Sequence, residues 1–349
     1  MPPLDSEKMV LTAVARAETR KAHAAAADEF LERRSANVVG VAEGIKWRNG
    51  TPTGDPALIV LVSHKVAKDE LSSKDAVPAK LGGVPTDVLD VGYLFAGGEA
   101  AAQDAAAQTL GKRLRPVQGG YSVGHKNITA GTIATCVYDI LPGGSTNPPV
   151  HGSGIPARYY ILSNNHVLAD SNAGAIGDAV LQPGPFDGGT DPADRIATLS
   201  RFVPIGLTPA VPLALQNNLV DAAIALGQFH DLNREVFWIG DIRGWRRKAD
   251  VTVGTPVRKT GRTTNFTTGR ITAVNATIDV DFGGGRVARF REQIVTTNMS
   301  AGGDSGSLVV TLDNVAIGLL FAGSPTAMIA NQIENVRALL RVEVAEQIL

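Results

Sequence analysis

The feature of this sequence that most limits its fold is a long series of short apolar runs after residue 115, separated by Gly, Pro and Asn. The runs have the length of β-strands, and Val, Ile, Thr and aromatic residues recur in them. Many short strands with few helical segments between them indicate a β-sandwich or a system of β-barrels. Because 349 residues exceed what one ordinary core holds, we expect two or three domains.

The first part of the chain and its last segment have a different pattern. Residues 5–33 are rich in Ala, Glu, Lys and Arg and predict a long helix. Between residues 36 and 95, three strand-like runs and the polar helical turn "AKDELSSKD" predict a small α/β module. An Ala-rich helix is expected at 98–111. Apolar residues at helical spacing predict a C-terminal helix over 331–349.

Composition argues against several classes of protein. The formal net charge of −1 gives the chain no overall field for nucleic acid or anionic lipid. We therefore expect no nucleic-acid partner and no membrane partner. No segment approaches the roughly 20 apolar residues that span a bilayer. The N-terminus carries acids early and lacks a secretory pattern, so we expect a cytoplasmic protein.

The cysteine, histidines and glycines of the sequence argue against a disulfide, a metal site and a phosphate-binding loop. The single cysteine, Cys136 in "TIATCVYDI", rules out an intrachain disulfide and predicts a buried strand thiol. The six histidines never pair at metal-ligand spacing, so neither a metal nor another cofactor is expected. The segment "DFGGGRV" at 281–287 is too short for a phosphate-binding loop and predicts a hairpin turn.

One serine has the sequence context of a nucleophile. "MSAGGDSGSLVV", residues 299–310, places Ser305 on a Gly-rich loop directly before an apolar run. By itself such a stretch is typical of a turn. A serine becomes nucleophilic only beside a base that an acid holds in the right tautomer. His166 follows the apolar strand "YYILS", and Asp221 precedes "AAIAL", where a buried carboxylate needs a partner. His125 is the other candidate base.

Three of these segments together resemble a known family. "SNNHVLAD", "NNLVDAAIAL" and "GGDSGSLV" are similar to the catalytic blocks of chymotrypsin-like serine proteases, in the family order His, Asp, Ser. "RKTGRTTNFTTGRI" at 258–271 resembles the strand–turn–strand that opens the second barrel of bacterial members. An α/β-hydrolase elbow is excluded, because Ser307 stands where that motif needs glycine.

The resemblance covers about residues 115–349 and implies a mainly β fold. We expect a chymotrypsin-like double six-stranded β-barrel, to which the α/β module and flanking helices are added. The expected domains are an N-terminal helix at 1–35, the module and a helix at 36–114, a first barrel at 115–245, and a second barrel with the C-terminal helix at 246–349.

The family also implies a role for each matching residue. Ser305 would be the nucleophile, His166 the general base and acid, and Asp221 the group that orients the imidazole. The backbone amides of Gly303 and Ser305 would form the oxyanion hole. The substrate pocket would be lined by uncharged residues and would accept an uncharged, apolar side chain; its members would be Met299, Ser300, Phe321, Ala322 and Gly323.

Asp304 precedes the nucleophile and is not explained by the triad. In activated digestive relatives the matching acid pairs with an N-terminus that cleavage releases. Here more than 110 residues precede the barrel and no segment resembles an activation site. We therefore expect another partner for Asp304 and no need for propeptide removal.

The N-terminal module gives a looser resemblance. With "RPVQGGYSVGH" it is similar to the front half of bacterial trypsin-like proteins related to the plant NARROW LEAF type. This implies an intracellular homo-oligomer that acts on protein or peptide substrates. Three functions stay open: a serine endopeptidase of narrow specificity, a protease-fold scaffold whose module drives assembly, and a protease limited to its own chain or one partner.

Overall fold

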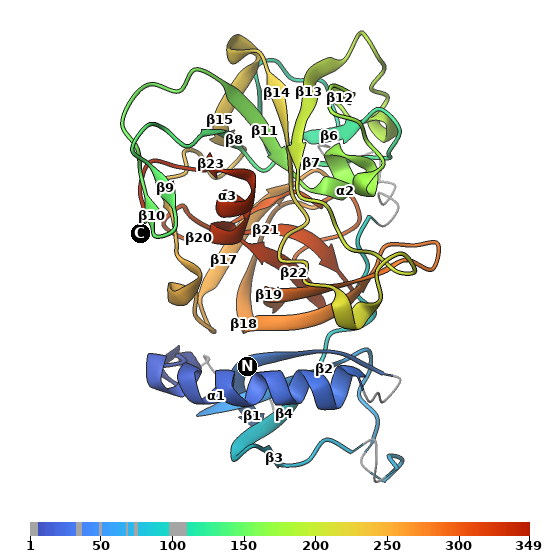
Figure 1. The fold of residues 1–349 in the computed structure, drawn as a ribbon, viewed down its shortest axis with the longest axis vertical. Coiled ribbons are helices and arrows are strands. Elements are labelled where there is room, and N and C mark those ends of the chain that lie inside the picture. Colours follow the sequence, from blue (N-terminus) through green and yellow to red (C-terminus); the bar gives the residue numbers. More distant parts are fainter. Residues whose placement is uncertain (1–5, 33–36, 49–50, 68, 73–75, 98–109) are drawn as a thin grey trace.

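The computed structural model describes residues 6–32, 37–48, 51–67, 69–72, 76–97 and 110–349. The protein is mainly β, and its barrels lie above a smaller N-terminal body (Figure 1). The helix expected at 98–111 lies almost wholly outside the described residues. Among the described residues, no helix is long and apolar enough to cross a membrane.

The second barrel closes on itself. Its strands follow the spatial order β17-β20-β21-β22-β19-β18, and β18 pairs back with β17. Closure removes most of the edges that an open sheet would expose, although the end of β21 near Gly323 extends past β20. The strands are β17 (Pro256–Gly261), β18 (Asn265–Asp281), β19 (Val287–Thr297), β20 (Leu308–Thr311), β21 (Val315–Gly323) and β22 (Ala327–Gln332). The residues between β18 and β19 form the expected hairpin, in which the Phe282 amide donates to the Arg286 carbonyl at 2.8 Å.

The first barrel region is an eight-stranded sheet in the order β23-β8-β11-β14-β13-β12-β6-β7. Its core contains Ile161, Val180, Leu199 and Ala223. The strands are β6 (Ser122–His125), β7 (Gly131–Thr132), β8 (Cys136–Asp139), β11 (Tyr159–Ser163), β12 (Ala179–Leu181), β13 (Arg195–Phe202), β14 (Ala223–Gly227) and β23 (Val342–Glu343).

Shorter elements connect and flank these sheets. β5 (Val117–Gly119) pairs with β15 (Leu232–Val236), β9 (Ser145–Thr146) with β10 (Pro149–Val150), and β16 (Gly244–Trp245) with β21. Apart from α2 (Asn165–Leu168), the connections contain single 3₁₀ turns at Asp170–Asn172, Pro185–Asp187, Leu213–Leu215, Phe229–Asp231 and Lys248–Asp250.

The N-terminal body consists of one helix on a small sheet. The long helix expected at 5–33 is divided into a 3₁₀ turn, α1 (Ala13–Ala27) and a π-helical turn at Asp28–Glu32. The sheet contains β1 (Val38–Arg48), β2 (Thr51–Val62), β3 (Lys80–Leu81) and β4 (Val84–Asp90). Of the expected polar helical turn, residues 69–71 form a turn and a bend.

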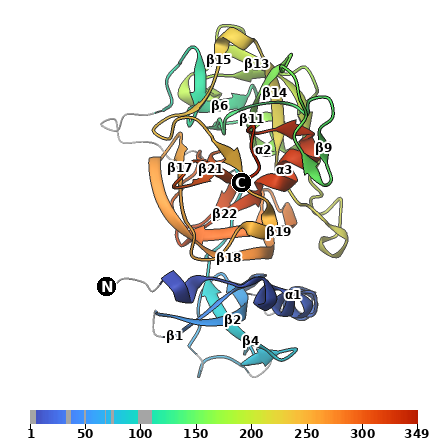
Figure 2. The ribbon, with the colours of Figure 1, turned by 90° about the vertical axis from the view of Figure 1, so that its left-hand side faces the viewer.

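This body is joined to the second barrel by hydrogen bonds as well as by packing. β1 pairs antiparallel with β18, so one sheet runs through both parts, and Figure 2 shows the body beneath β18 from a second direction. One face of β1–β2 packs on α1 through Val41 and Val60. The other face packs on barrel residues through Ile59 and Leu61. Burial on both faces explains why the second half of β2, residues 57–62, is a continuous apolar run.

The C-terminal helix is shorter than its sequence pattern predicts. α3 spans Ile333–Leu340 and ends at Arg341, which has a left-handed φ of 56°. The chain then returns as β23, which pairs with β8. The Arg337 guanidinium donates to Glu343 at 2.8 Å, and both side chains are buried, so this ion pair holds the returning strand against the helix.

Candidate active site

His166 and Asp221 form a buried pair at the carboxyl end of one strand and the amino end of its neighbour. β11 ends at Ser163, and the short helix α2 places His166 opposite the residues that lead into β14. The imidazole Nδ1 lies 2.5 Å from Oδ2 of Asp221, and the His166 amide donates to Oδ1 at 3.1 Å. Asp221 is fully buried. The carboxylate therefore fixes both the ring orientation and the tautomer of His166.

The second ring nitrogen of His166 is left available. Among the described residues, the buried Nε2 atom of His166 has no hydrogen-bond partner. With Nδ1 donating to Asp221, Nε2 is the proton acceptor of the neutral ring. The ring of Phe282 stands edge-on beside it, with the two centroids 6.2 Å apart. An oriented imidazole with a free acceptor is the arrangement that general-base catalysis requires.

The other candidate base, His125, has both nitrogens engaged. Its Nε2 atom lies 3.1 Å from Oδ2 of Asp178, and its Nδ1 atom accepts from the Asn127 amide at 3.2 Å. Asp178 also pairs with Lys126 at 2.5 Å. The structure thus gives His125 a structural environment at the end of β6.

Ser305 lies on the loop between β19 and β20, and the first barrel region holds this loop. The Thr132 amide on β7 donates to the Ser305 carbonyl at 2.7 Å, and the Thr132 hydroxyl donates to the Gly303 carbonyl at 2.9 Å. Gly306 has φ +96°, and a Cβ there would clash with the Ser163 hydroxyl, three residues before His166. The serine loop is therefore packed against the strand that leads to His166.

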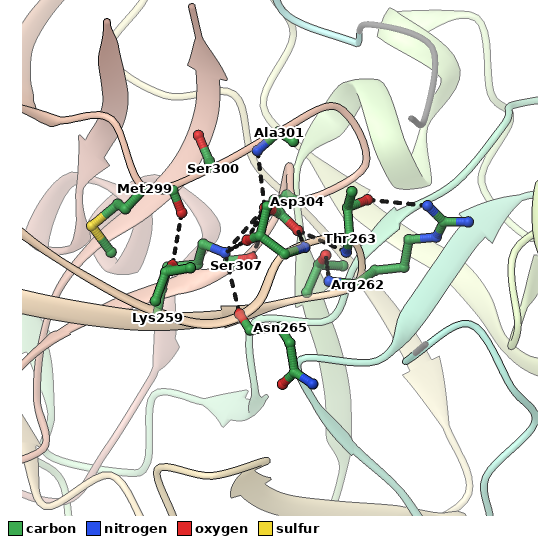
Figure 3. A network of polar contacts seen from close by, with 12 residues as sticks. Lys259, Arg262, Thr263, Asn265, Met299, Ser300, Ala301, Asp304 and Ser307 are labelled. Carbon is green, nitrogen blue, oxygen red and sulfur yellow. Dashed lines mark hydrogen bonds and ion pairs between the residues drawn. The ribbon is translucent and has the colours of Figure 1, made fainter. Parts of the chain in front are cut away.

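Asp304 holds the same loop from within the second barrel (Figure 3). Its Oδ1 atom accepts from the amides of Thr263 at 2.8 Å and Thr264 at 3.1 Å. Its Oδ2 atom accepts from the Ala301 amide at 3.0 Å, the Thr264 hydroxyl at 2.6 Å and the Lys259 ammonium at 3.0 Å. Several donors to one buried carboxylate fix the loop around it.

Lys259 is the partner of Asp304 that the sequence left open. Both side chains are fully buried. Burial lowers the pKa of Lys259, and the charge of Asp304 acts in the opposite direction. A Cβ at Gly261 would clash with Oδ1 of Asp304 and would lie 2.7 Å from Oγ of Ser307, so this pair needs the glycine beside it.

The backbone around Ser305 offers two donors. Gly303 has φ +95°, a conformation that favours glycine. In the described part of the chain, the amides of Gly303 and Ser305 donate no hydrogen bond. Two free amides beside a serine can stabilise an oxyanion that develops there.

A cavity of about 380 Å³ opens beside Ser305. Of the five expected pocket residues, Ser300, Ala322 and Gly323 line it. Its other lining residues are Phe95, Gly97, Asn298, Ala301, Gly302, Ser305, Leu320, Ser324 and Pro325, none of them charged.

The structure places the other two expected pocket residues in the core. Met299 packs among apolar residues of the second barrel, including Val257 and Ile271. The ring of Phe321 is fully buried and lies 4.5 Å from that of Phe290, centroid to centroid.

The described residues contain no group of three His, Cys, Asp or Glu that could hold a metal ion. Cys136 is buried in β8, as its sequence context predicts, and burial raises the pKa of its thiol to about 12.

Comparisons with known proteins find one family model and a set of similar solved structures. Residues 22–92 match the family model of the NARROW LEAF 1 N-terminal domain. A search of curated proteins finds no match. Among solved structures, a glutamic acid specific serine protease that uses a histidine triad in substrate binding is 19% identical, with a TM-score of 0.44, 65% of this chain and 99% of that chain covered.

Two further similar structures are bacterial proteases. Thermobifida fusca protease A is 15% identical, covers 66% of this chain over 99% of its own length, and has a TM-score of 0.43. A Cellulomonas bogoriensis chymotrypsin is 17% identical, with the same coverage and a TM-score of 0.41. Identities this low do not transfer a substrate or an activity, so the chemistry of this chain is inferred from its own contacts.

Proposed function

We propose that this chain is a serine endopeptidase that hydrolyses peptide bonds through Ser305, His166 and Asp221. The observation that carries the proposal is the buried His166–Asp221 pair, whose 2.5 Å contact leaves Nε2 free as the proton acceptor. A structural histidine such as His125 has both nitrogens engaged. A free, oriented base and a serine on a braced loop are two of the elements that nucleophilic catalysis needs.

The reaction follows from these groups. Ser305 Oγ bonds to the substrate carbonyl carbon while His166 Nε2 takes the hydroxyl proton. The amides of Gly303 and Ser305 stabilise the oxyanion, and such donors are worth about 10²–10³ in rate each. The carbon–nitrogen bond breaks as His166 returns its proton to the departing amine. Water, deprotonated by His166, then releases the acyl group and restores Ser305.

The cavity beside Ser305 sets the class of substrate. Its described lining residues are uncharged, and Ala301, Gly302, Ala322 and Gly323 are small. Buried charge without a partner is costly, so a charged substrate side chain is disfavoured here. We infer a preference for a small or apolar uncharged residue on the acyl side of the cleaved bond. The cytoplasmic location and the homo-oligomeric state stay predictions.

A peptide library, incubated with the purified full-length chain and read by mass spectrometry, tests the proposal. Wild type should cleave after uncharged side chains, and Ser305→Ala and His166→Ala should each lose at least about 10³-fold in rate. His125→Ala is the matched control and should retain activity within about threefold. Cleavage that persists in Ser305→Ala would refute the endopeptidase assignment, as would a folded wild type that neither cleaves peptides nor reacts with a small fluorophosphonate at Ser305.

A further inference from the structure

The connection between the N-terminal body and the barrels contains a short strand-like segment, Leu94 to Gly97, that pairs with the edge of β21. The Phe95 amide donates to the Gly323 carbonyl at 3.1 Å, and the Gly323 amide donates to the Phe95 carbonyl at 3.1 Å. The bridge is antiparallel. Gly323 faces β22 on its other side, where its pairing partner is Met328. Phe95 therefore forms hydrogen bonds with both the amide and the carbonyl of Gly323 on this edge of β21.

The segment is held from its opposite side as well. The Asp281 amide at the end of β18 donates to the Leu94 carbonyl at 3.0 Å, and the Ala96 amide donates to the Asp281 carbonyl at 2.9 Å. Leu94 and Ala96 are only 3% and 2% exposed. The segment is thus bridged at Phe95 to the ends of both β18 and β21.

After Phe95 the chain runs toward His166. Two residues after Phe95, a Cβ on Gly97 would lie 3.6 Å from the imidazole Cδ2 atom of His166. Phe95 and Gly97 line the same 380 Å³ cavity as Ser305. A peptide that paired with Gly323 next to Ser305 would need the backbone groups that Phe95 already bonds, although the segment itself bends at Ala96 and Gly97.

Extended peptides bind proteins by adding a strand to an exposed sheet edge. Here the chain itself supplies that strand. An intramolecular strand on a short connection acts at an effective concentration in the millimolar range. An external peptide would have to displace it before binding the same edge.

We propose that the segment Leu94–Gly97 is a built-in pseudosubstrate strand, which occupies the acyl-side substrate site on β21 and limits access to extended peptides. This inference rests on the proposed endopeptidase function and names the regulation of its site. Small reagents that need only Ser305 and its oxyanion donors do not use the β21 edge. The segment should therefore slow long ligands more than short ones.

Two inactivators, one long and one short, test whether the segment slows ligands that need the β21 edge. An alanine-based tetrapeptidyl diphenyl phosphonate needs the edge of β21, whereas a small alkyl fluorophosphonate does not. Phe95→Pro removes the amide that donates to Gly323. The ratio of the second-order rate constants, tetrapeptidyl over small, should rise at least about tenfold in Phe95→Pro. Tyr93→Ala changes an exposed neighbour that does not line the cavity, and its rate ratio should stay within about threefold of wild type.

Hydrogen exchange on wild type gives a second test that needs no variant. In the tetrapeptidyl adduct the Phe95 amide should lose protection while the Gly323 amide keeps it. In the small fluorophosphonate adduct both should stay protected. A Phe95 amide that remains protected in the tetrapeptidyl adduct would overturn the proposal.

The two reagents distinguish a failure of the pseudosubstrate proposal from a failure of the endopeptidase proposal. If the small reagent modifies Ser305 but the rate ratio is unchanged in a folded Phe95→Pro variant, the pseudosubstrate is refuted and the endopeptidase stands. If neither reagent modifies Ser305 in any variant, the endopeptidase is refuted and the pseudosubstrate with it. Cleavage of the wild-type chain directly after Gly97 would show that the segment is a substrate and not an inhibitor.

Discussion

The Lys259 ammonium lies 3.0 Å from the carboxylate of Asp304, and neither side chain is exposed to solvent. Asp304 is adjacent to Ser305 and accepts hydrogen bonds from the residues that shape the serine loop. Lys259, a buried lysine of the second barrel, therefore holds the serine loop in place through Asp304.

Removing this cation should destabilise the protein. Lys259→Met leaves Asp304 buried without its charge partner, and breaking such a pair typically costs about 3–5 kcal/mol. Denaturant unfolding monitored by circular dichroism measures the change. Arg258→Ala is the matched control, because Arg258 is the neighbouring cation and is only partly buried. A Lys259→Met variant as stable as Arg258→Ala would contradict the role given to the pair.

The same pair predicts that the chain needs no N-terminal trimming for its nucleophile to react. Asp304 already has an internal cation, so a newly released amino group is not required to form the loop. Full-length protein should react with a small fluorophosphonate at the same rate before and after limited proteolysis of its N-terminal body. A full-length chain that is inert until one defined cleavage would disprove this prediction.

Asp221→Asn should reduce catalysis without removing the fold. An amide at this position can present a donor to Nδ1 and so favour the wrong tautomer of His166. In a comparable triad this change lowers kcat about 10⁴-fold. Peptide hydrolysis rates and the melting temperature should be measured together. Asp178→Asn, which alters the partner of His125, should change kcat by less than about threefold; equal losses in both variants would argue against the assigned acid.

The Cys136 thiol should make stability fall at alkaline pH. Its pKa is raised from 9.0 to about 12 in the folded chain. Below pH 9 the thiol is protonated in both states, and above it only the unfolded state loses the proton. Between pH 8 and 10.5 wild type should therefore lose about 2 kcal/mol more unfolding free energy than Cys136→Ala. Equal losses in the two proteins would show that the folded thiol titrates normally.

The positions of His166 and Asp221 in the fold were predictable because each residue stands next to a strand of clear pattern. His166 follows the apolar run of β11 and Asp221 precedes that of β14, so local sequence places both at the ends of neighbouring strands. Lys259 was missed, although a signal exists. In "VRKTG" the alternation of β17 puts Lys259 on the same buried side as Val257. A lysine at an inward strand position requires a buried acid.

Other features depend on contacts that no local pattern encodes. The C-terminal helix ends at Arg341 because the chain turns back to pair with β8, about 200 residues earlier. The N-terminal sheet joins the second barrel through β18, whose length exceeds that of an ordinary strand. The Phe95–Gly323 bridge involves single residues far apart in sequence. The spacing of apolar residues and the composition describe one segment at a time. They therefore do not predict which distant segments pair.

The central claim, that Ser305 is a nucleophile activated by His166, is tested most directly by mapping the adduct of a small fluorophosphonate. Intact and peptide mass spectrometry should be applied to wild type, Ser305→Ala, His166→Ala and the control His125→Ala. We predict one adduct per chain, located on Ser305, in wild type and His125→Ala, and none in the other two variants. Folded wild-type protein without an adduct, or an adduct that persists in Ser305→Ala, would contradict the account.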